Sequence, residues 1–377
     1  MVEFSRRVPL LEDTNPFMEK AATRRAADPE FVDLVETNPT RVGLTVAPAP
    51  FLALPPLYDP DPKGLPSARA AVARYFGAHV DPGDILLTAS TSEAYSLLFK
   101  LLGDAGDEIL VPMPSYPLFE HLTTLEELAP KAYGLQYANE RWRINEASLR
   151  GARTQRSRAL VLVHPNNPTG SYVHPEDVAR LPEGLPLIVD EVFFDYPKAH
   201  LAFTPDRVAD ARPDSLTFSL GGLSKLCALP QAKLAWIRVS GPDEQKLAAM
   251  ERLAFIADAY LSVGTAIQAL APSLLENRSS IQRRISERVE RNAIVLEDAI
   301  LNVPHLAERT REGGWYAVLE LTTRSSAETF ADRLLETGVF VHPGYFYDFE
   351  EENLIVLSLL TPEDAWKKGI ERLALLA

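Results

Sequence analysis

The stretch ALVLVHPNNPTG, residues 159–170, joins an apolar run to a polar loop. Its first five residues are apolar without alternation, which is typical of a strand that is buried on both faces of a parallel sheet. Similar short runs occur at 84–88, 108–111, 187–189, 216–218 and 234–237. Helical segments lie between several of these runs, so the pattern predicts an α/β fold with a mostly parallel sheet flanked by helices.

The two ends of the chain show a different pattern. Near the start, helices are expected at about 16–27 and at 66–76, the second beginning with a proline and ending before a glycine. After about residue 242 we expect long helices, one of them near 280–301, then strands near 315–321, 339–341 and 355–357 and a helix from about 362. We therefore expect a large domain of residues 46–278 and a smaller α+β domain formed by residues 1–45 and 279–377.

Composition narrows the class of protein. The net charge is −14 for 377 residues, so no excess of basic side chains is present to neutralise phosphates, and we expect no nucleic-acid partner. Cys227 is the only cysteine, which excludes an intramolecular disulfide framework and a cysteine metal cluster. The start of the chain lacks a signal-like apolar region, and no run approaches 18 apolar residues. A cytoplasmic protein without a membrane span and without a bound metal is expected.

Three polar residues follow the buried runs. Asn167 lies after the run at 159–163, Asp190 closes the run at 187–189, and Lys225 follows the run at 216–218. Pyridoxal 5′-phosphate (PLP) needs a lysine amine for its aldehyde, a carboxylate for its pyridine nitrogen and a hydrogen-bond donor for its 3-oxygen. Lys225, Asp190 and Asn167 have these chemistries in turn, and the sequence therefore predicts PLP as cofactor.

The three residues differ in how specific they are. The Asn-Asn-Pro-Thr-Gly loop combines an amide, a rigid proline and a hydroxyl, whereas a plain turn needs only one or two such residues. An unpaired carboxylate at Asp190 is costly in an apolar strand, so it needs a buried partner, either a pyridinium or a structural ion pair. Lys225 lies among few charges, where the pKa of an amine falls and its nucleophilicity rises.

A phosphate site is predicted at the start of the helix near residue 91. Ser90, Thr91 and Ser92 offer hydroxyl groups beside the free amides of the first helical turn, and Ser90 with Glu93 has capping-box spacing. The alternative is that these residues only cap the helix. Tyr116, in a proline-rich loop after the next strand, is positioned to stack on a planar cofactor, although ordinary packing is the alternative.

The order and spacing of these motifs resemble the fold type I, class I/II PLP-dependent aminotransferase family over essentially the whole chain. The resemblance implies that Lys225 forms the internal aldimine, a Schiff base, and moves the proton during catalysis. It also implies that Asp190 protonates the pyridine nitrogen, that Asn167 binds the 3-oxygen and that Tyr116 stacks on the ring. Further residues follow from it: Ser90, Thr91, Ser92 and Ser224 for the phosphate, Tyr58 for the phosphate of the neighbouring subunit in a homodimer with shared sites, and cis bonds before Pro114 and Pro168.

The chain departs from the pattern of this family near the cofactor. Phe193 stands where a tyrosine usually donates to the 3-oxygen, which leaves Asn167 to carry that interaction largely alone. Gly222 replaces a common phosphate-binding serine. Lys233 replaces a phosphate-binding arginine, and it keeps the charge but loses the bidentate geometry.

A fourth departure concerns the substrate. Val356 stands where the family has the arginine that binds the substrate α-carboxylate. Either another cation substitutes, with Arg24, Arg25 and Arg41 of the N-terminal arm as candidates, or the substrate is not held by an α-carboxylate at this place. Asn38 in the arm and Tyr345 after Pro343-Gly344 are predicted to line the substrate pocket.

These features support one main hypothesis and two alternatives. The main hypothesis is an aminotransferase that moves an amino group between an amino acid or amine and an oxo acid through a Lys225 aldimine. Phe193 and Val356 favour a PLP-dependent lyase or decarboxylase as the alternative. A PLP-binding sensor without turnover is a further hypothesis, but such regulators usually carry a basic DNA-binding domain, which this chain lacks.

Overall fold

A large sheet forms the centre of the molecule. The computed structural model describes residues 15–39, 41–44, 60–322 and 326–377. In these residues the large sheet has eight strands in the order β2-β9-β8-β7-β6-β3-β4-β5. Its central pairs β8-β7, β7-β6, β6-β3 and β3-β4 are parallel, while β2-β9, β9-β8 and β4-β5 are antiparallel. The strands are β2 (Ile85–Thr88), β3 (Glu108–Met113), β4 (Ala129–Ala138), β5 (Arg141–Ile144), β6 (Ser157–Val163), β7 (Leu187–Asp190), β8 (Thr217–Gly222) and β9 (Ala235–Ser240).

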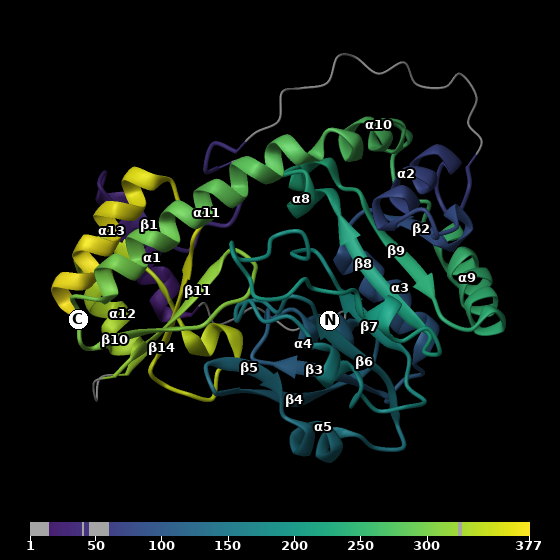
Figure 1. Ribbon diagram of the computed structural model, residues 1–377, viewed down its shortest axis with the longest axis horizontal. Helices are drawn as coiled ribbons and strands as arrows, with labels where there is room; N and C mark the ends of the chain where they lie inside the picture. Colours follow the sequence, from purple (N-terminus) through teal and green to yellow (C-terminus); the bar gives the residue numbers. More distant parts are fainter. Residues whose placement is uncertain (1–14, 40, 45–59, 323–325) are drawn as a thin grey trace, which may run out of the picture.

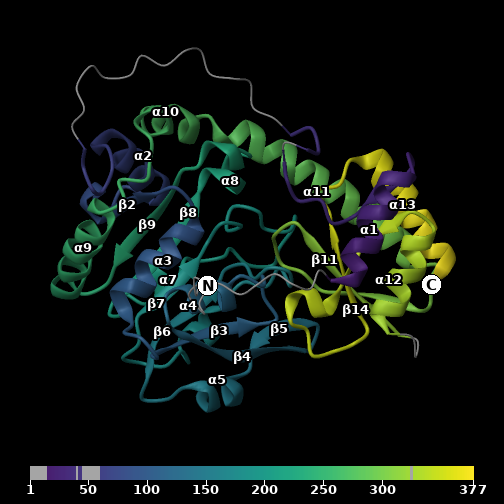
Figure 2. The same cartoon turned by 180° about the vertical axis from the view of Figure 1, so that it is seen from behind.

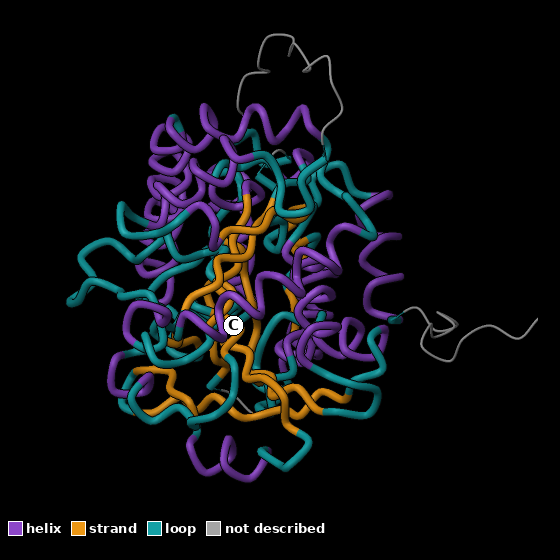
Figure 3. Tube along the Cα trace, turned by 90° about the vertical axis from the view of Figure 1, so that its right-hand side faces the viewer, coloured by secondary structure: helices purple, strands orange, loops and turns teal. Residues whose placement is uncertain are grey.

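Helices cover both faces of this sheet, as Figure 3 shows by the helical segments on either side of the central strands. Apolar residues of α3 and α9 pack on one face together with alternate residues of β3, β6 and β8. On the other face, α2 and α10 pack against β2 and β9 near Trp236. The helices of this part are α2 (Pro66–Phe76), α3 (Thr91–Leu102), α4 (Phe119–Leu125), α5 (Glu146–Ala152), α6 (Pro175–Val178), α7 (Val208–Ala211), α8 (Leu223–Leu226), α9 (Asp243–Asp258) and α10 (Thr265–Glu276).

A second, smaller group of elements gathers at one end of the molecule (Figures 1 and 2). Its four-stranded sheet has the order β10-β11-β14-β13, and a separate two-stranded sheet pairs β1 with β12 in parallel. The long helix α11 runs from the large sheet to this group (Figure 1). The elements are α1 (Pro16–Ala27), β1 (Val32–Asp33), α11 (Arg278–Ile300), β10 (Leu306–Arg309), β11 (Tyr316–Leu321), α12 (Ala327–Glu336), β12 (Val339–Phe340), β13 (His342–Pro343), β14 (Leu354–Ser358) and α13 (Glu363–Leu376).

The predicted fold class is confirmed. Strands form at all six apolar runs, and helices form at 16–27 and 66–76, as expected. In the large sheet, β4 and β5 were not predicted, because β4 contains a proline and a glycine and its residues are only partly buried. The short strands β1, β10 and β13 of the smaller group were not predicted either. In the described part of the chain, no helix is long and apolar enough to cross a membrane.

Candidate active site

The three predicted cofactor residues lie at the carboxyl ends of three adjacent parallel strands, β6, β7 and β8. Val163, the last residue of β6, pairs with Asp190, and Asp190 in turn pairs with Leu220 of β8. Asn167 follows β6 by four residues, and Lys225 lies in α8 directly after β8. Since the loops at this edge meet above the sheet, residues far apart in the sequence come together where α/β proteins bind ligands.

Asp190 is held by two hydrogen bonds. The backbone N–H of Val192 donates to Oδ1 at 3.1 Å, and the hydroxyl of Tyr95 donates to Oδ2 at 3.1 Å. Burial raises the pKa of Asp190 to about 6, while these two hydrogen bonds and the charge of Lys225 oppose the rise. The site therefore contains a desolvated carboxylate that gains from a cationic partner.

Lys225 is the cationic residue whose charge acts on this carboxylate. Burial lowers the pKa of Lys225 to about 8, and the charges of Asp190 and Glu36 oppose the shift. Its Nζ lies 5.6 Å from the ring centre of Phe193 and 5.4 Å from that of Trp315. The sequence predicted a lowered pKa here, and burial of the amine is its physical cause.

The Asn-Asn-Pro-Thr-Gly loop is rigidly braced. Asn166 Oδ1 accepts a hydrogen bond from the Thr169 hydroxyl at 2.9 Å, and the bond before Pro168 is cis. The carbonyl of Gly170 accepts from Gly313 N at 2.9 Å. A Cβ atom at Gly170, which has φ +69°, would lie 2.4 Å from the Gly313 carbonyl oxygen, so only glycine fits this contact. The bond before Pro114 is also cis, as expected, and so is the bond before Pro165.

The predicted phosphate residues lie at the first turn of α3. Ser90 is the N-cap, and its Oγ accepts from Glu93 N at 3.1 Å, which confirms the capping interaction. The Ser90 O–H and the first backbone N–H groups of α3 are donors that can make hydrogen bonds to an anion. Thr88, just before this turn, pairs with Ala235, and Ala235 also pairs with Gly222. The starts of α3 and α8 therefore flank the same end of β9, where Ser92 and Ser224 also lie.

Two of the departures have local structural explanations. A Cβ at Gly222 would lie 3.0 Å from the Cβ of Ala235, so the close pairing of β8 with β9 leaves little room for a serine. Lys233 is exposed and has a left-handed backbone conformation, φ 54°. It lies two residues before Ala235, on the loop that leads into the predicted phosphate site, which is compatible with a charge contact there.

Aromatic residues lie near the carboxyl ends of β6, β7 and β8, a place that we call the recess. Phe193 is buried and packs edge-to-face on Trp315 with 5.1 Å between ring centres. Tyr116 remains 50% exposed. A half-exposed ring in this position is available for stacking.

Most of the predicted substrate residues lie in β14 and in the N-terminal arm. Val356 is fully buried in β14, where it pairs with Val318 and His342. Arg24 pairs with Asp28 at 3.1 Å, and Arg25 pairs with Asp33. These two arginines of α1 are therefore engaged outside the recess.

Arg41 differs from the other two candidates because its Nη1 lies 3.4 Å from Glu36 Oε2, and Glu36 acts electrostatically on Lys225. Asn38 donates its backbone N–H to Glu36 Oε1 at 2.8 Å. The hydroxyl of Tyr345 accepts from Asn15 at 3.4 Å, so its role in a substrate pocket stays a prediction. Tyr58 lies outside the described residues.

Several residues at the site were not predicted from the sequence. Tyr95 donates to Asp190, Glu36 acts on the charge of Lys225, and Trp315 covers its amine. Tyr316, the first residue of β11, packs edge-to-face on Phe193 with 6.1 Å between ring centres. No local motif marks these residues, since each contacts a partner that is distant in the sequence.

Comparison with known proteins defines the family. The chain matches the model of the family "Aminotransferase class I and II" over residues 59–373. Alanine aminotransferase of Mycobacterium tuberculosis (strain ATCC 25618 / H37Rv) is 28% identical over 321 residues, which cover 80% of this chain and 68% of the relative. Nicotianamine aminotransferase A of Hordeum vulgare is 27% identical over 335 residues, which cover 82% and 70%. The solved structure of an alanine aminotransferase from Pyrococcus furiosus has a TM-score of 0.86 at 20% identity, over 99% of this chain and 98% of that one.

The chain therefore belongs to the class I and II aminotransferase family. It is an enzyme that transfers amino groups between amino and oxo acids, and its cofactor is PLP. The alternative of a lyase or decarboxylase is not favoured, because the relatives are named for amino transfer.

Proposed function

We propose that amino transfer between an amino acid or amine and an oxo acid takes place at the site formed by Lys225, Asp190 and Asn167. The observation that carries this proposal is the placement of the three residues at the ends of β6, β7 and β8, which are neighbours in the sheet. A basic amine, a desolvated carboxylate and an amide then face one recess, as PLP requires.

The donors and acceptors of the site fit this cofactor. Asn167 Oδ1 is buried and has no hydrogen-bond partner among the described residues. Asp190 has a raised pKa that an adjacent cation would lower. A pyridine ring with a protonated nitrogen facing Asp190 would compensate that carboxylate, and its 3-oxygen would accept a hydrogen bond from the side-chain N–H of Asn167.

Lys225 has the proton-transfer role in this proposal. With a pKa of about 8, a substantial fraction of its amine is unprotonated near neutral pH, in contrast to an ordinary lysine. A free amine can attack an aldehyde, and it can later take a proton from the substrate Cα and return it. When PLP is bound, it supplies the conjugated ring that withdraws electrons from that carbon. The hydrogen bond from Tyr196 Oη to the Lys225 carbonyl, 2.6 Å, fixes the backbone from which the amine reaches.

The remaining residues of the site would bind the cofactor and orient it. Asp190 would hold the proton on the pyridine nitrogen, and Tyr116 would stack on the ring. The phosphate would be bound by Ser90, Thr91, Ser92, Ser224 and Lys233. Phe193 contributes an apolar wall next to Lys225, and it lacks the hydroxyl with which to bind the 3-oxygen. Asn38 and Tyr345 remain proposed substrate contacts.

A single-turnover experiment tests the proposed reaction. The PLP-loaded enzyme is mixed with L-alanine or L-glutamate without an oxo acid, and cofactor absorbance and the released products are followed. We expect a lasting shift of the cofactor to its aminated form and one oxo acid per site, with no shift in Lys225→Ala. Return of the original absorbance with release of ammonia or CO₂ would instead show elimination or decarboxylation.

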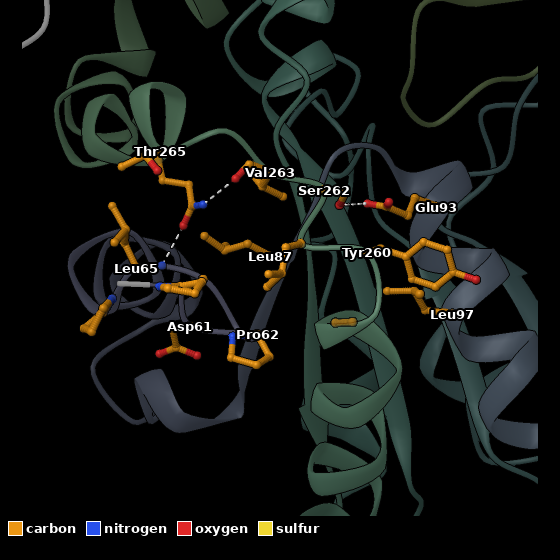
Figure 4. A pocket seen from close by; sticks show the side chains of 16 residues that line it. Asp61, Pro62, Leu65, Leu87, Glu93, Leu97, Tyr260, Ser262, Val263 and Thr265 are labelled. Atoms are coloured by element: carbon orange, nitrogen blue, oxygen red, sulfur yellow. Dashed lines mark hydrogen bonds between the residues drawn. The ribbon is translucent and has the colours of Figure 1, made fainter. Parts of the chain in front are cut away.

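A homodimer with shared sites is part of the proposal. A pocket of about 620 Å³ opens between the loop at residues 60–66, the start of α3 and the loop that joins α9 to α10 (Figure 4). Glu93 lines it and accepts from the Ser262 hydroxyl at 2.8 Å, close to the predicted phosphate site. Tyr260 on its rim is 57% exposed, and nearby Phe255 is 82% exposed. Exposed aromatic residues beside the cofactor end of the sheet support a subunit interface on this face.

The domain division and the location are proposed as well. The parallel pairing of β1 with β12 joins the arm to the C-terminal part, which supports a small domain formed by residues 1–45 and 279–377 beside a large domain of 46–278. The single, buried Cys227 is compatible with a reducing cytoplasm.

A further inference from the structure

Tyr95 joins helix α3 to the carboxylate of the site. It lies in the second turn of α3, after the N-cap Ser90, and is only 3% exposed. Its hydroxyl donates to Oδ2 of Asp190 at 3.1 Å. Asp190 closes β7, so this hydrogen bond connects a covering helix with the end of a central strand. The helix whose first turn is proposed to bind the cofactor phosphate therefore also contacts the carboxylate proposed to bind the pyridine nitrogen.

Aromatic packing fixes the direction of this phenol. The Tyr95 ring packs edge-to-face on Phe119 of α4, with 5.4 Å between ring centres. It also lies 5.8 Å from the ring centre of Phe99, in the same helix. Both phenylalanines are buried. A buried phenol needs a hydrogen-bond partner, and because the ring is held from two sides, its hydroxyl is kept beside Asp190.

Asp190 has a donor on each of its two carboxylate oxygens. The backbone N–H of Val192 donates to Oδ1 at 3.1 Å, and Tyr95 donates to Oδ2. An ionised carboxylate has further lone pairs, so it can also accept a pyridinium N–H. Val192 belongs to the same segment as Asp190 and moves with it, whereas Tyr95 comes from a separate element. Tyr95 is therefore the contact that sets the direction of the carboxylate relative to α3.

The Tyr95 hydroxyl also acts on the charge of Asp190. Burial raises the pKa of Asp190 to about 6. The backbone N–H of Val192, the hydroxyl of Tyr95 and the charge of Lys225 oppose that rise. Since a hydrogen bond to the ionised form lowers the pKa of a carboxyl group, loss of the Tyr95 hydroxyl would raise this pKa toward neutrality. Tyr95 itself stays protonated, because burial, Asp190 and Tyr133 raise its pKa well above the ordinary value.

We propose that Tyr95 is a positioning residue whose hydrogen bond orients the Asp190 carboxylate and keeps it ionised for the protonated pyridine nitrogen of PLP. This role rests on the proposed function of the Lys225 site, and Tyr95 acts in it through Asp190. An ionised carboxylate that is a weak base leaves the proton on the pyridine nitrogen. A more basic carboxyl group would take that proton, and the ring would withdraw electrons less strongly.

The test is the pH dependence of PLP binding by Tyr95→Phe, which removes one oxygen atom and keeps the packed ring. The Kd is measured by fluorescence titration of the PLP-free proteins over a range of pH. Binding by the wild type should weaken as the pH falls through the pKa of Asp190, about 6. We expect this midpoint to rise by about one pH unit in the variant, the size that loss of a hydrogen bond to a charged group produces. An unchanged midpoint would overturn the role.

Nuclear magnetic resonance of the cofactor locates the proton itself. PLP that is isotopically labelled at its ring nitrogen is bound to both proteins, and the chemical shift of this nitrogen distinguishes the protonated from the unprotonated ring. At the same pH, Tyr95→Phe should be displaced from the wild type toward the unprotonated form. Identical shifts in the two proteins would contradict the role.

Tyr133→Phe is the matched control. It removes a hydroxyl that is as deeply buried but donates to the Val161 carbonyl at 2.8 Å. Its binding midpoint and nitrogen shift should equal those of the wild type. A change as large as that in Tyr95→Phe would show a general effect of losing a buried hydroxyl, and the role would fall.

A fluorinated tyrosine at position 95 tests the role without removing the hydroxyl, and it serves even where Tyr95→Phe does not fold. Fluorine makes the phenol a stronger donor, so the binding midpoint should fall below that of the wild type. A midpoint that rises or stays unchanged would contradict the role. Failure of the wild type to attach PLP at Lys225 would overturn the proposed function itself, whereas normal attachment with equal midpoints would overturn only the role of Tyr95.

Discussion

At the residue scale, Asp190 shows how the fold prepares for a cofactor at a cost in stability. Its carboxylate has hydrogen bonds from Val192 and Tyr95, yet burial still raises its pKa from 3.8 to about 6. A carboxylate whose pKa is raised by folding destabilises the folded state when it is ionised. The charge is retained because a bound cation, the pyridinium of PLP, would compensate it.

Replacement of Asp190 should therefore separate stability from function. The folded state binds the proton of Asp190 more tightly than the unfolded state, so this residue's contribution to stability falls as the pH rises from about 4 to about 6 and stays low above that. Without PLP, Asp190→Asn should be more stable than the wild type at pH 7, by up to about 3 kcal/mol for a shift of about two pKa units. It should nevertheless bind PLP more weakly and lose most activity.

Urea unfolding of the PLP-free proteins at several pH values measures the difference. It should shrink as the pH falls toward 4 and vanish below about 3, where the wild-type carboxyl group is protonated in both states. A variant that is less stable than the wild type at pH 7 would contradict the desolvation of Asp190.

Some residues of the site could be predicted from the sequence, and others could not. Asn167 and Lys225 were predictable because each stands in a distinctive local motif behind an apolar run. Tyr95 was not, because it is 95 positions from Asp190, the residue it contacts. Tyr316 was hidden for the same reason, since Phe193, on which its ring packs, comes from another element. Contacts between distant elements depend on the assembled fold, which no local pattern describes.

At the element scale, helix α3 combines a structural role with a proposed binding role at the same residue. Ser90 caps the helix by accepting from Glu93 N, and its hydroxyl proton remains available to a phosphate. The helix dipole and the free amides of its first turn add to the attraction for an anion.

Ser90→Ala should lower the free energy of unfolding by about 1 kcal/mol, the usual cost of a lost N-cap, and should also weaken PLP binding. Ser326→Ala provides the matched control, since Ser326 caps α12 by accepting from Thr329 N at 3.2 Å. Both variants should lose similar stability, but only Ser90→Ala should raise the Kd for PLP in a fluorescence titration. If both variants bind PLP like the wild type, the phosphate does not lie at α3.

The burial of each strand explains which strands could be predicted from the sequence. Strands β6, β7 and β8 are buried on both faces, so their apolar runs are continuous and easily recognised. β4 and β5 lie at the edge of the sheet and are only partly buried. Partial exposure permits polar residues, proline and glycine, and the hydrophobic signal is lost.

At the scale of the whole molecule, the exposed aromatic residues near the pocket of Figure 4 are consistent with a dimer. Tyr260 and Phe255 come from the end of α9 and the loop after it. They lie in the part of the molecule that holds the large sheet, whereas the exposed Leu375, 87% accessible, lies on α13 at the other end of the molecule.

Sedimentation analysis of charged substitutions tests this assembly. Tyr260→Glu should convert a dimer into monomers and reduce PLP retention, because a buried charge without a partner is unfavourable at an interface. Leu375→Glu introduces the same charge on α13 and should remain dimeric. A Tyr260→Glu protein that sediments as the wild type does would exclude this face from the interface.

Covalent trapping tests the central claim, that Lys225 holds the cofactor, most directly. The purified enzyme is incubated with PLP and reduced with borohydride, and its peptides are analysed by mass spectrometry. We predict one phosphopyridoxyl group per chain, on Lys225, with no label in Lys225→Ala and normal labelling in Lys198→Ala. Labelling of a different lysine, or undiminished labelling of Lys225→Ala, would contradict the account.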